Sequence, residues 1–354
     1  MQEKITPQAV SLHPAVNHAR LALVREEAIE PDRIIVDSHL HLWGAPRVPY
    51  LHDEFLADAR SGHRIVGTVY TECTESYRQT GPEELRSVGE TETIAKLAAG
   101  VAVPGTPSEG FYNASIGFAD LQLGGRVREV LEAHVEAAQG RFRGIRQSSA
   151  WDPHPEVKST IRTPPANMLA QGNFREGFKV LQHMGMVFDA WCYFHQLEEL
   201  AQLAGAFPDT QIVLDHAGGP VGIGPYAWQK AEVFKRWSVG IREVARRPNV
   251  SVKLGGLGMR LFGGEFHTRA IPPGSDELAR VWRPFIETCI DAFGPQRAMF
   301  ESNFPVDQAT CSYAVLWNTF KRITAKYSDI EKYALFSGTA ARVYRLRIPA
   351  IADR

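Results

Sequence analysis

Two histidines spaced one residue apart follow a short apolar run near the start of the chain. The run from Ile34 to Val36 is β-branched, as in a strand buried on both faces, and His39 and His41 follow it. Because side chains alternate along an extended backbone, both imidazoles point to the same side. Imidazoles are common metal ligands and general bases, so the spacing predicts half of a metal or acid–base site at a strand end. The pair alone leaves open that one ring packs under a loop while the other faces solvent.

Other chemically active side chains follow apolar runs elsewhere in the chain. They are Glu72, Arg146 with Gln147, Tyr193 or His195, Asp215 with His216, Lys253, and Glu301 with Asn303. Asp215 and His216 close an apolar run just before a Gly-Gly-Pro turn, which favours a role in a site over a purely structural one. Arg146 and Lys253 follow or interrupt buried runs, where an unpaired charge is costly. Each must therefore meet a carboxylate of a substrate or of the protein, and pairing with Glu72 is the structural alternative.

These positions become neighbours only if the apolar runs are strands of one sheet. Eight such runs alternate with helical patterns from Ile34 to about Tyr344, and no glycine fingerprint of a doubly wound sheet follows the first run. We therefore predict a (β/α)8 TIM barrel, in which the carboxyl ends of all strands surround one mouth. The predicted strands begin at Ile34, Ile65, Ser115, Phe142, Met186, Gln211, Val250 and Ala298.

Two irregular segments stand outside this alternation. Residues 1–33 carry a helical pattern from Val16 to Ala28, and we interpret them as an N-terminal extension lying on the main domain or on a partner subunit. The barrel domain then spans residues 34–350. The longest irregular stretch, Ser148 to Met168, follows the fourth strand and is rich in proline. It contains Trp151, Asp152, His154, Arg162 and Asn167. A loop at that position is expected to cover or bind a substrate, so Trp151 is a candidate substrate-binding residue.

Composition excludes several classes of function. The chain has 39 Lys and Arg against 40 Asp and Glu, so no general basic field indicates binding to nucleic acid or to a membrane surface. The four cysteines lie far apart without a C-x-x-C pair, which fits a reducing compartment better than a disulfide scaffold. No stretch has the pattern of a signal peptide or a membrane span. We expect a cytoplasmic protein with a small-molecule substrate, and the extension is compatible with a homodimer.

Five motifs, in order along the chain, resemble the amidohydrolase superfamily, and within it the amidohydrolase-2 branch that contains sugar-acid lactonases and 2-pyrone-4,6-dicarboxylate lactonase. They are the segments Val36 to Trp43, Phe142 to Gln147, Ile212 to Pro220, Val252 to Leu257 and Met299 to Val306. The resemblance implies a barrel hydrolase that opens a lactone, a cyclic ester, of a carboxylated or polyhydroxylated small molecule. It implies that His39, His41 and His216 form the floor of the site and that Arg146 binds a substrate carboxylate.

The motif after the eighth strand departs from the superfamily pattern. Asn303 stands where that pattern ordinarily has an aspartate, and an amide cannot accept a proton from water at neutral pH. Glu301, two residues earlier and on the same face of the strand, is our first candidate for the missing general base. Asp307, after the turn at Pro305, and His216, oriented by another carboxylate, are the alternatives.

The branch is mixed in its use of metal, and this chain leaves both options open. His39, His41 and His216 suffice in number for one divalent zinc or manganese ion with an open position. The amide of Asn303, however, is a poorer ligand than a carboxylate. A bound ion would polarise the carbonyl and lower the pKa of water, whereas a metal-independent site would need the histidines and Lys253 to donate hydrogen bonds to the oxyanion.

Two other classes of function fit the same residues. The first is a metal-dependent non-oxidative decarboxylase, which neighbouring members of the branch resemble. The second is a barrel that has lost catalysis and binds a ligand, which Asn303 alone suggests. In each case the residues expected to contact the small molecule are Arg146, Lys253, Glu72, Tyr193 and Trp151.

Overall fold

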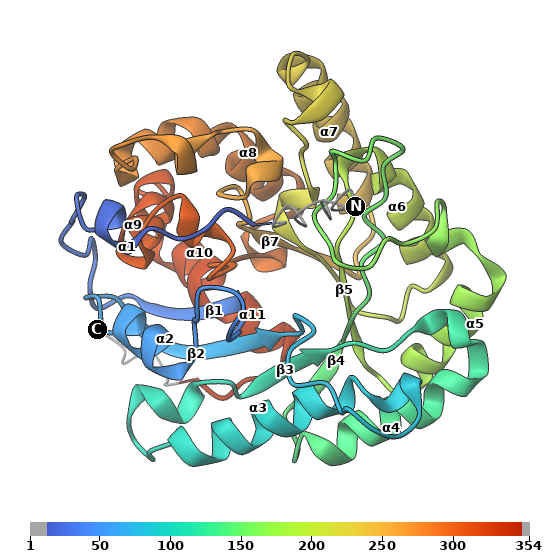
Figure 1. The fold of residues 1–354 in the computed structure, drawn as a ribbon. Helices are drawn as coiled ribbons and strands as arrows, with labels where there is room; N and C mark the ends of the chain where they lie inside the picture. The colour runs from blue at the N-terminus through green and yellow to red at the C-terminus, as the bar shows by residue number, and fades with distance from the viewer. Residues whose placement is uncertain (1–12, 349–354) are drawn as a thin grey trace, which may run out of the picture.

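The computed structural model describes residues 13–348 and shows a barrel of parallel strands inside a ring of helices (Figure 1). Each of the eight strands pairs in parallel with the next one along the chain. A parallel bridge between Leu40 and Phe304 joins the first strand to the segment after the last. The predicted (β/α)8 barrel is confirmed. The strands are β1 Ile34–Leu40, β2 Arg64–Thr71, β3 Ala114–Gly117, β4 Phe142–Arg146, β5 Val187–Ala190, β6 Ile212–Leu214, β7 Val250–Leu254 and β8 Ala298–Phe300.

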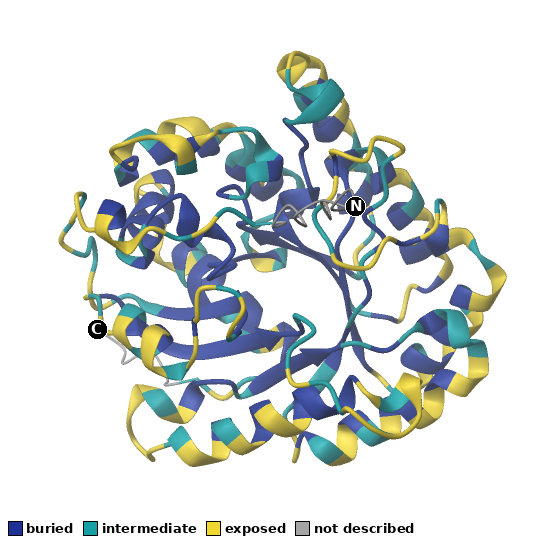
Figure 2. Cartoon of the chain, viewed as in Figure 1, coloured by how far each residue is buried: buried dark blue, intermediate teal, exposed yellow. Residues whose placement is uncertain are grey.

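Helices follow the strands and cover the outside of the barrel, with their apolar faces inward and their polar faces in solvent (Figure 2). The helices before the fourth strand are α1 His18–Leu21, α2 His52–Ala59, α3 Val88–Val101 and α4 Val127–Ala137. Those after it are α5 Gly172–His183, α6 Leu197–Ala206, α7 Lys230–Ala245, α8 Ser275–Phe293, α9 Tyr313–Ile323, α10 Asp329–Tyr333 and α11 Thr339–Val343. Among the described residues, none of these helices combines the length and the hydrophobicity needed to cross a membrane.

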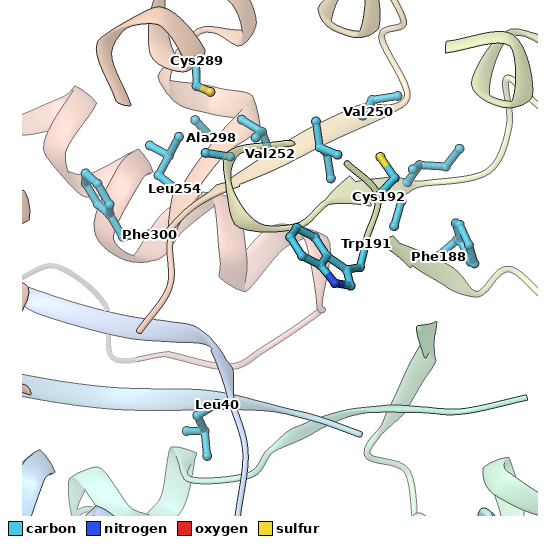
Figure 3. Close-up of a cluster of buried hydrophobic side chains, with 14 of the residues drawn as sticks. Leu40, Phe188, Trp191, Cys192, Val250, Val252, Leu254, Cys289, Ala298 and Phe300 are labelled. Atoms are coloured by element: carbon cyan, nitrogen blue, oxygen red, sulfur yellow. The ribbon is translucent and has the colours of Figure 1, made fainter. Parts of the chain in front are cut away.

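Strand alternation decides which side chains enter the barrel. In β7, Val250, Val252 and Leu254 lie in the large apolar cluster between strands and helices, beside Cys289 of α8 (Figure 3). Because successive side chains point to opposite faces, Lys253 points into the barrel instead. The alternation of side chains along β7 is therefore enough to bring the charged Lys253 to the barrel axis.

The amino-terminal half of the barrel interior is filled with apolar side chains. A second cluster contains the strand residues Val36, Val66, Val69, Ala114, Ile116, Val187, Val213 and Met299, together with Ala340, Val343 and Tyr344 from the C-terminal segment. This layer is closed from below by α11, and its members are almost fully buried. Among the described residues, this apolar layer fills the amino-terminal end of the barrel, so the axis is open to a substrate from the carboxyl ends of the strands.

The described part of the N-terminal segment lies against the barrel's own helices. Arg20 donates hydrogen bonds to the carbonyl oxygens of Arg269 at 2.6 Å and of Ala309 at 3.1 Å. Glu26 accepts one from the backbone N–H of Ser275 at 2.7 Å. The helix predicted from Val16 to Ala28 is wrong except for the short α1, because polar groups in this segment bond to the barrel rather than to a helix of their own.

Candidate active site

Three histidines from two strand ends meet at the carboxyl end of the barrel. The ring centroids of His39 and His41 lie 4.8 Å apart, and those of His39 and His216 lie 4.7 Å apart. Burial, and then the charge of Lys253, hold the pKa of His39 well below its usual range. Burial and Arg146 act in the same direction on the pKa of His41. The rings of His39 and His41 are therefore neutral, and each has one nitrogen that can bind a cation or accept a hydrogen bond.

Glu301 connects two of these rings from behind. Its Oε1 accepts a hydrogen bond from Nδ1 of His216 at 2.8 Å and another from the His216 backbone N–H at 3.1 Å. Its Oε2 lies 3.1 Å from Nδ1 of His39. Burial opposes ionisation, but interaction with His216 and His39 outweighs it and brings the pKa of Glu301 to about 2. Because an ionised carboxylate only accepts hydrogen bonds, we assign the proton of His216 to Nδ1, which leaves a lone pair on Nε2.

A buried lysine lies on the other side of His39. Nζ of Lys253 is 2.6 Å from Asp189 Oδ2, 3.1 Å from Asp215 Oδ1 and 3.0 Å from His39 Nδ1. None of these side chains has any exposed surface. Burial alone would lower the pKa of Lys253, but the two carboxylates outweigh it and raise the pKa. Tyr344 donates a hydrogen bond to Asp189 at 3.0 Å, so the charged lysine is enclosed on the barrel floor.

Arg146, the last residue of β4, is paired with a carboxylate of the protein. Its Nε donates to Glu72 Oε1 at 2.9 Å, and its Nη2 donates to the Glu72 carbonyl oxygen at 2.5 Å. Nη1 lies 3.1 Å from Nε2 of His39. The structural alternative raised for Arg146 is therefore present, and the guanidinium brings a fixed positive charge to the histidine cluster.

Asn303 takes its place in the site through a left-handed turn, with φ of +53°. Its backbone N–H donates to the His39 carbonyl oxygen at 2.9 Å, and its Nδ2 donates to Oδ1 of Asp307 at 2.9 Å. Oδ2 of Asp307 accepts a hydrogen bond from the Gly258 backbone N–H at 2.9 Å. Burial raises the pKa of Asp307 to about 7. The amide of Asn303 is thus held by Asp307 rather than presented as a base.

A cavity of about 240 Å³ opens over the histidines. The predicted site residues in its wall are His41, His216, Asn303, Arg146 and Glu72. The predicted residues behind that wall, fully buried, are His39, Glu301 and Lys253. The substrate-binding roles predicted for Tyr193 and Trp151 find no support in the cavity, because neither residue lines it. Instead, the Tyr193 hydroxyl bonds to Ser159 at 2.8 Å and the Trp151 carbonyl accepts from His195 at 3.0 Å, so both brace the long loop.

The spacing of the histidine pair suits two ligands of one divalent ion, but Nη1 of Arg146 lies 3.1 Å from Nε2 of His39 and would have to move aside for an ion to bind there. Nε2 of His39 and Nε2 of His41 lie 3.2 Å apart, which suits two imidazoles bound at about 2.0–2.1 Å to a shared ion. Nδ1 of His41 donates to the Thr71 carbonyl oxygen at 2.7 Å, so its Nε2 keeps the lone pair that a ligand needs. The described residues contain two other groups whose ligand atoms all lie within 4.8 Å of one another. The first is His39, His216 and Glu301, and the second is His39, Asp189 and Asp215. In the second group, Nζ of Lys253 already takes the central position.

A family model described as amidohydrolase matches residues 36–346 of the chain. The chain belongs to the amidohydrolase family. Within the curated relatives, an uncharacterised protein of Sinorhizobium fredii is 34% identical over 337 residues, which cover 89% of this chain and 99% of that protein. An L-fucono-1,5-lactonase of Burkholderia multivorans is 33% identical over 240 residues, covering 68% of this chain and 73% of the lactonase. The predicted family membership, and with it the expectation of an enzyme, is confirmed.

Solved structures of other amidohydrolases share the fold of this one. A zinc-bound amidohydrolase from Burkholderia multivorans superimposes with a TM-score of 0.67 at 24% identity, covering 89% of this chain and 100% of that one. A manganese-bound 5-carboxyvanillate decarboxylase from Novosphingobium aromaticivorans gives 0.56 at 13% identity, covering 91% and 99%. At these identities the likeness shows the fold alone. Both neighbours hold a divalent metal, and this amidohydrolase has buried side chains able to hold one.

Sequence reasoning missed several residues of this amidohydrolase site. Asp189 is an acidic residue inside the apolar run of β5, the same signal that singled out Lys253, and it could have been found that way. Phe118 lines the cavity from the end of β3 and carries no polar group, so no simple pattern marks it. Arg162 was predicted only as a member of the long loop, and its place in the cavity wall was not predicted, because no strand or helix period fixes loop conformation.

Proposed function

We propose that this amidohydrolase opens a lactone by attack of water on the ring carbonyl. The observation that carries the proposal is the hydrogen bond from His216 Nδ1 to Glu301 at 2.8 Å, because it leaves the opposite nitrogen of a cavity-lining ring as a proton acceptor. The name of the Burkholderia multivorans relative, an L-fucono-1,5-lactonase, supports the substrate class. The structure favours His216 over Glu301 as the base, since Glu301 lies behind the ring and does not line the cavity.

In the proposed reaction, Nε2 of His216 takes a proton from water while the water oxygen attacks the carbonyl carbon. The protonated ring then returns the proton to the ring oxygen of the lactone as the acyl–oxygen bond breaks, which gives a hydroxy acid. Glu301 acts through His216 as a positioning residue. It fixes the tautomer and stabilises the positive charge that the imidazole carries between the two steps.

Negative charge develops on the carbonyl oxygen, and the cavity wall offers a cation to meet it. Arg146 is held rigidly by two hydrogen bonds to Glu72 and lies beside the histidines, so its guanidinium needs no rearrangement during the reaction. A divalent ion bound by His39 and His41 would supply further polarisation of the carbonyl at this point. Lys253 contributes a buried charge that holds His39 from below, without contacting the substrate.

The test is acid release by the purified protein, followed at constant pH with lactones of five- and six-membered rings. Each substrate is assayed with added zinc, with added manganese and after chelation. We expect one or more lactones to be opened well above the uncatalysed rate in at least one of these conditions. If every lactone matches the blank in all three, the proposal is wrong. Carbon dioxide release from aromatic carboxylic acids in the same conditions would instead favour the decarboxylase alternative.

Further parts of the expected function stay proposals. The small-molecule substrate follows from the family and the cavity, whereas a homodimer, a cytoplasmic location and the absence of nucleic-acid binding rest on composition and on the segment 1–33. Analytical ultracentrifugation at micromolar concentration separates monomer from dimer directly. The division of the chain at residue 33 is best tested by removing residues 1–33 and measuring the midpoint of thermal unfolding.

A further inference from the structure

Three arginines line the cavity, and they differ in how their charge is balanced. Arg146 is bonded to Glu72, and Nη1 of Arg47 lies 3.6 Å from a carboxylate oxygen of Glu75. Arg162, on the loop between β4 and α5, makes no ion pair with any described aspartate or glutamate. One guanidinium of the cavity wall therefore lacks a counter-ion within the part of the chain that the structure describes.

Neutral groups hold this guanidinium in place. Its central carbon lies 3.9 Å from the ring centroid of Phe118, and its Nη2 donates a hydrogen bond to the Tyr77 hydroxyl at 3.0 Å. An aromatic face and a phenol orient an arginine without neutralising it. No other side-chain hydrogen bond of Arg162 forms with the described residues, so several N–H groups of the planar fork remain for a ligand.

We infer that Arg162 binds a carboxylate carried by the substrate, and that this amidohydrolase acts on an anionic lactone. The inference rests on the proposed function and narrows its substrate class. A planar guanidinium matches a carboxylate with two parallel N–H···O bonds, which fixes orientation as well as charge. The sequence-based assignment of this role to Arg146 stays a prediction, and Glu72 already accepts hydrogen bonds from two of the Arg146 nitrogens.

The position of Arg162 also separates recognition from chemistry. His216 and Arg146 come from the carboxyl ends of β6 and β4, whereas Arg162 comes from the long loop over the mouth, and all three line one cavity. A carboxylate bound at the loop would leave the ring carbonyl free to reach the histidines. Arg162, which would bind the substrate carboxylate, thus lies on a loop, whereas the residues that take part in the reaction lie at strand ends.

The test compares two lactones that differ only in charge. The γ-lactone of 2-hydroxyglutarate carries a carboxylate where γ-valerolactone carries a methyl group, and a δ-lactone pair of the same design covers the larger ring. We expect the wild-type protein to favour the carboxylated member by tenfold or more in kcat/KM. We expect Arg162→Met to raise KM for that member by about tenfold or more, with kcat nearly unchanged. Arg162→Met should lower kcat/KM for the methyl lactone by a smaller factor than for the carboxylated one, and Arg162→Lys retains part of the preference.

Arg236→Met is the matched control. Arg236 lies over the ring of Phe194 at 5.1 Å, also makes no ion pair among the described residues, and is outside the cavity. A similar KM for both lactones in wild type, or an equal loss on both lactones in Arg162→Met, would overturn the inference.

If no lactone is opened, the proposed function fails but the arginine can still be tested. Calorimetric titration with 2-hydroxyglutarate, the ring-opened diacid, then measures binding directly. The inference holds if wild type and Arg236→Met bind the diacid while Arg162→Met binds it at least tenfold more weakly. It is overturned if wild type shows no binding at millimolar concentration, or if Arg162→Met binds equally well.

Discussion

The floor beneath His39 and the cavity wall above it both concentrate charge, but they balance it differently. On the floor, Lys253 meets Asp189 and Asp215 with no solvent contact, so every charge has a partner within the protein. In the wall, the lone pair of His216 and the guanidinium of Arg162 face an open cavity. The comparison teaches that buried ion pairs orient the reacting groups here, while the side chains that keep unused hydrogen-bonding atoms are those available to a substrate.

Replacing His216 should produce the largest effect, because the wall would lose its proton acceptor. We predict that His216→Asn lowers kcat by about 10²–10⁴-fold on any lactone the wild type opens. His183→Asn, which changes a histidine at the end of α5 outside the cavity, is the control and should leave kcat unaltered. Steady-state kinetics of both variants test this prediction. Full activity in His216→Asn would show that His216 is not the proton acceptor.

Replacing Lys253 should act on stability, because the floor would keep two carboxylates without their cation. We predict that Lys253→Met lowers the free energy of unfolding by about 3–5 kcal/mol, measured by urea denaturation. The exposed Lys326→Met should change it by less than about 0.5 kcal/mol. A Lys253→Met protein as stable as wild type would mean that the floor charges are not coupled as described.

Replacing Glu301 should affect both regions, since this carboxylate joins the floor to the wall. We predict that Glu301→Gln lowers kcat by about 10–100-fold, as for other partners that orient a histidine, and leaves KM nearly unchanged. The pH dependence of kcat/KM should also shift, which a merely structural defect would not cause. A variant with raised KM and an unaltered pH profile would instead place Glu301 in substrate binding.

Contacts made by strand residues can be predicted from the sequence, because the regular alternation of side chains along a strand fixes their direction. Contacts that depend on packing or on loop conformation cannot. The strand period places His39, Lys253 and Glu301 on the barrel axis, so the barrel and its convergent strand ends are predictable. The choice of ion-pair partners is not predictable from the sequence. Glu72 could have paired with Arg146 or with Lys253, and only the packing of the folded chain places it against Arg146. The loop residue Arg162 was still less predictable, because its place over Phe118 depends on the path of an irregular segment.

The smallest predicted effect is the acid sensitivity of the Glu301 contact. The folded-state pKa of Glu301 is about 2, against an ordinary value of 4.5, so the unfolded chain binds a proton first as pH falls. Stability from this contact is therefore complete above pH 4.5 and is lost as pH falls toward 2. Between pH 6 and pH 4, wild type should lose about 1 kcal/mol of unfolding free energy relative to Glu301→Gln. Urea denaturation at both pH values checks this, and a constant difference would contradict it.

The central claim is that Glu301 holds the proton of His216 on Nδ1, so that a lone pair on Nε2 faces the cavity. The most direct measurement is a two-bond ¹H–¹⁵N spectrum of the protein labelled in its histidines, recorded at pH 8, with His216→Asn to identify the signals. We predict a protonated Nδ1 and an unprotonated Nε2 for His216. A proton on Nε2 instead would contradict the account, because that ring could not take a proton from water on the cavity side.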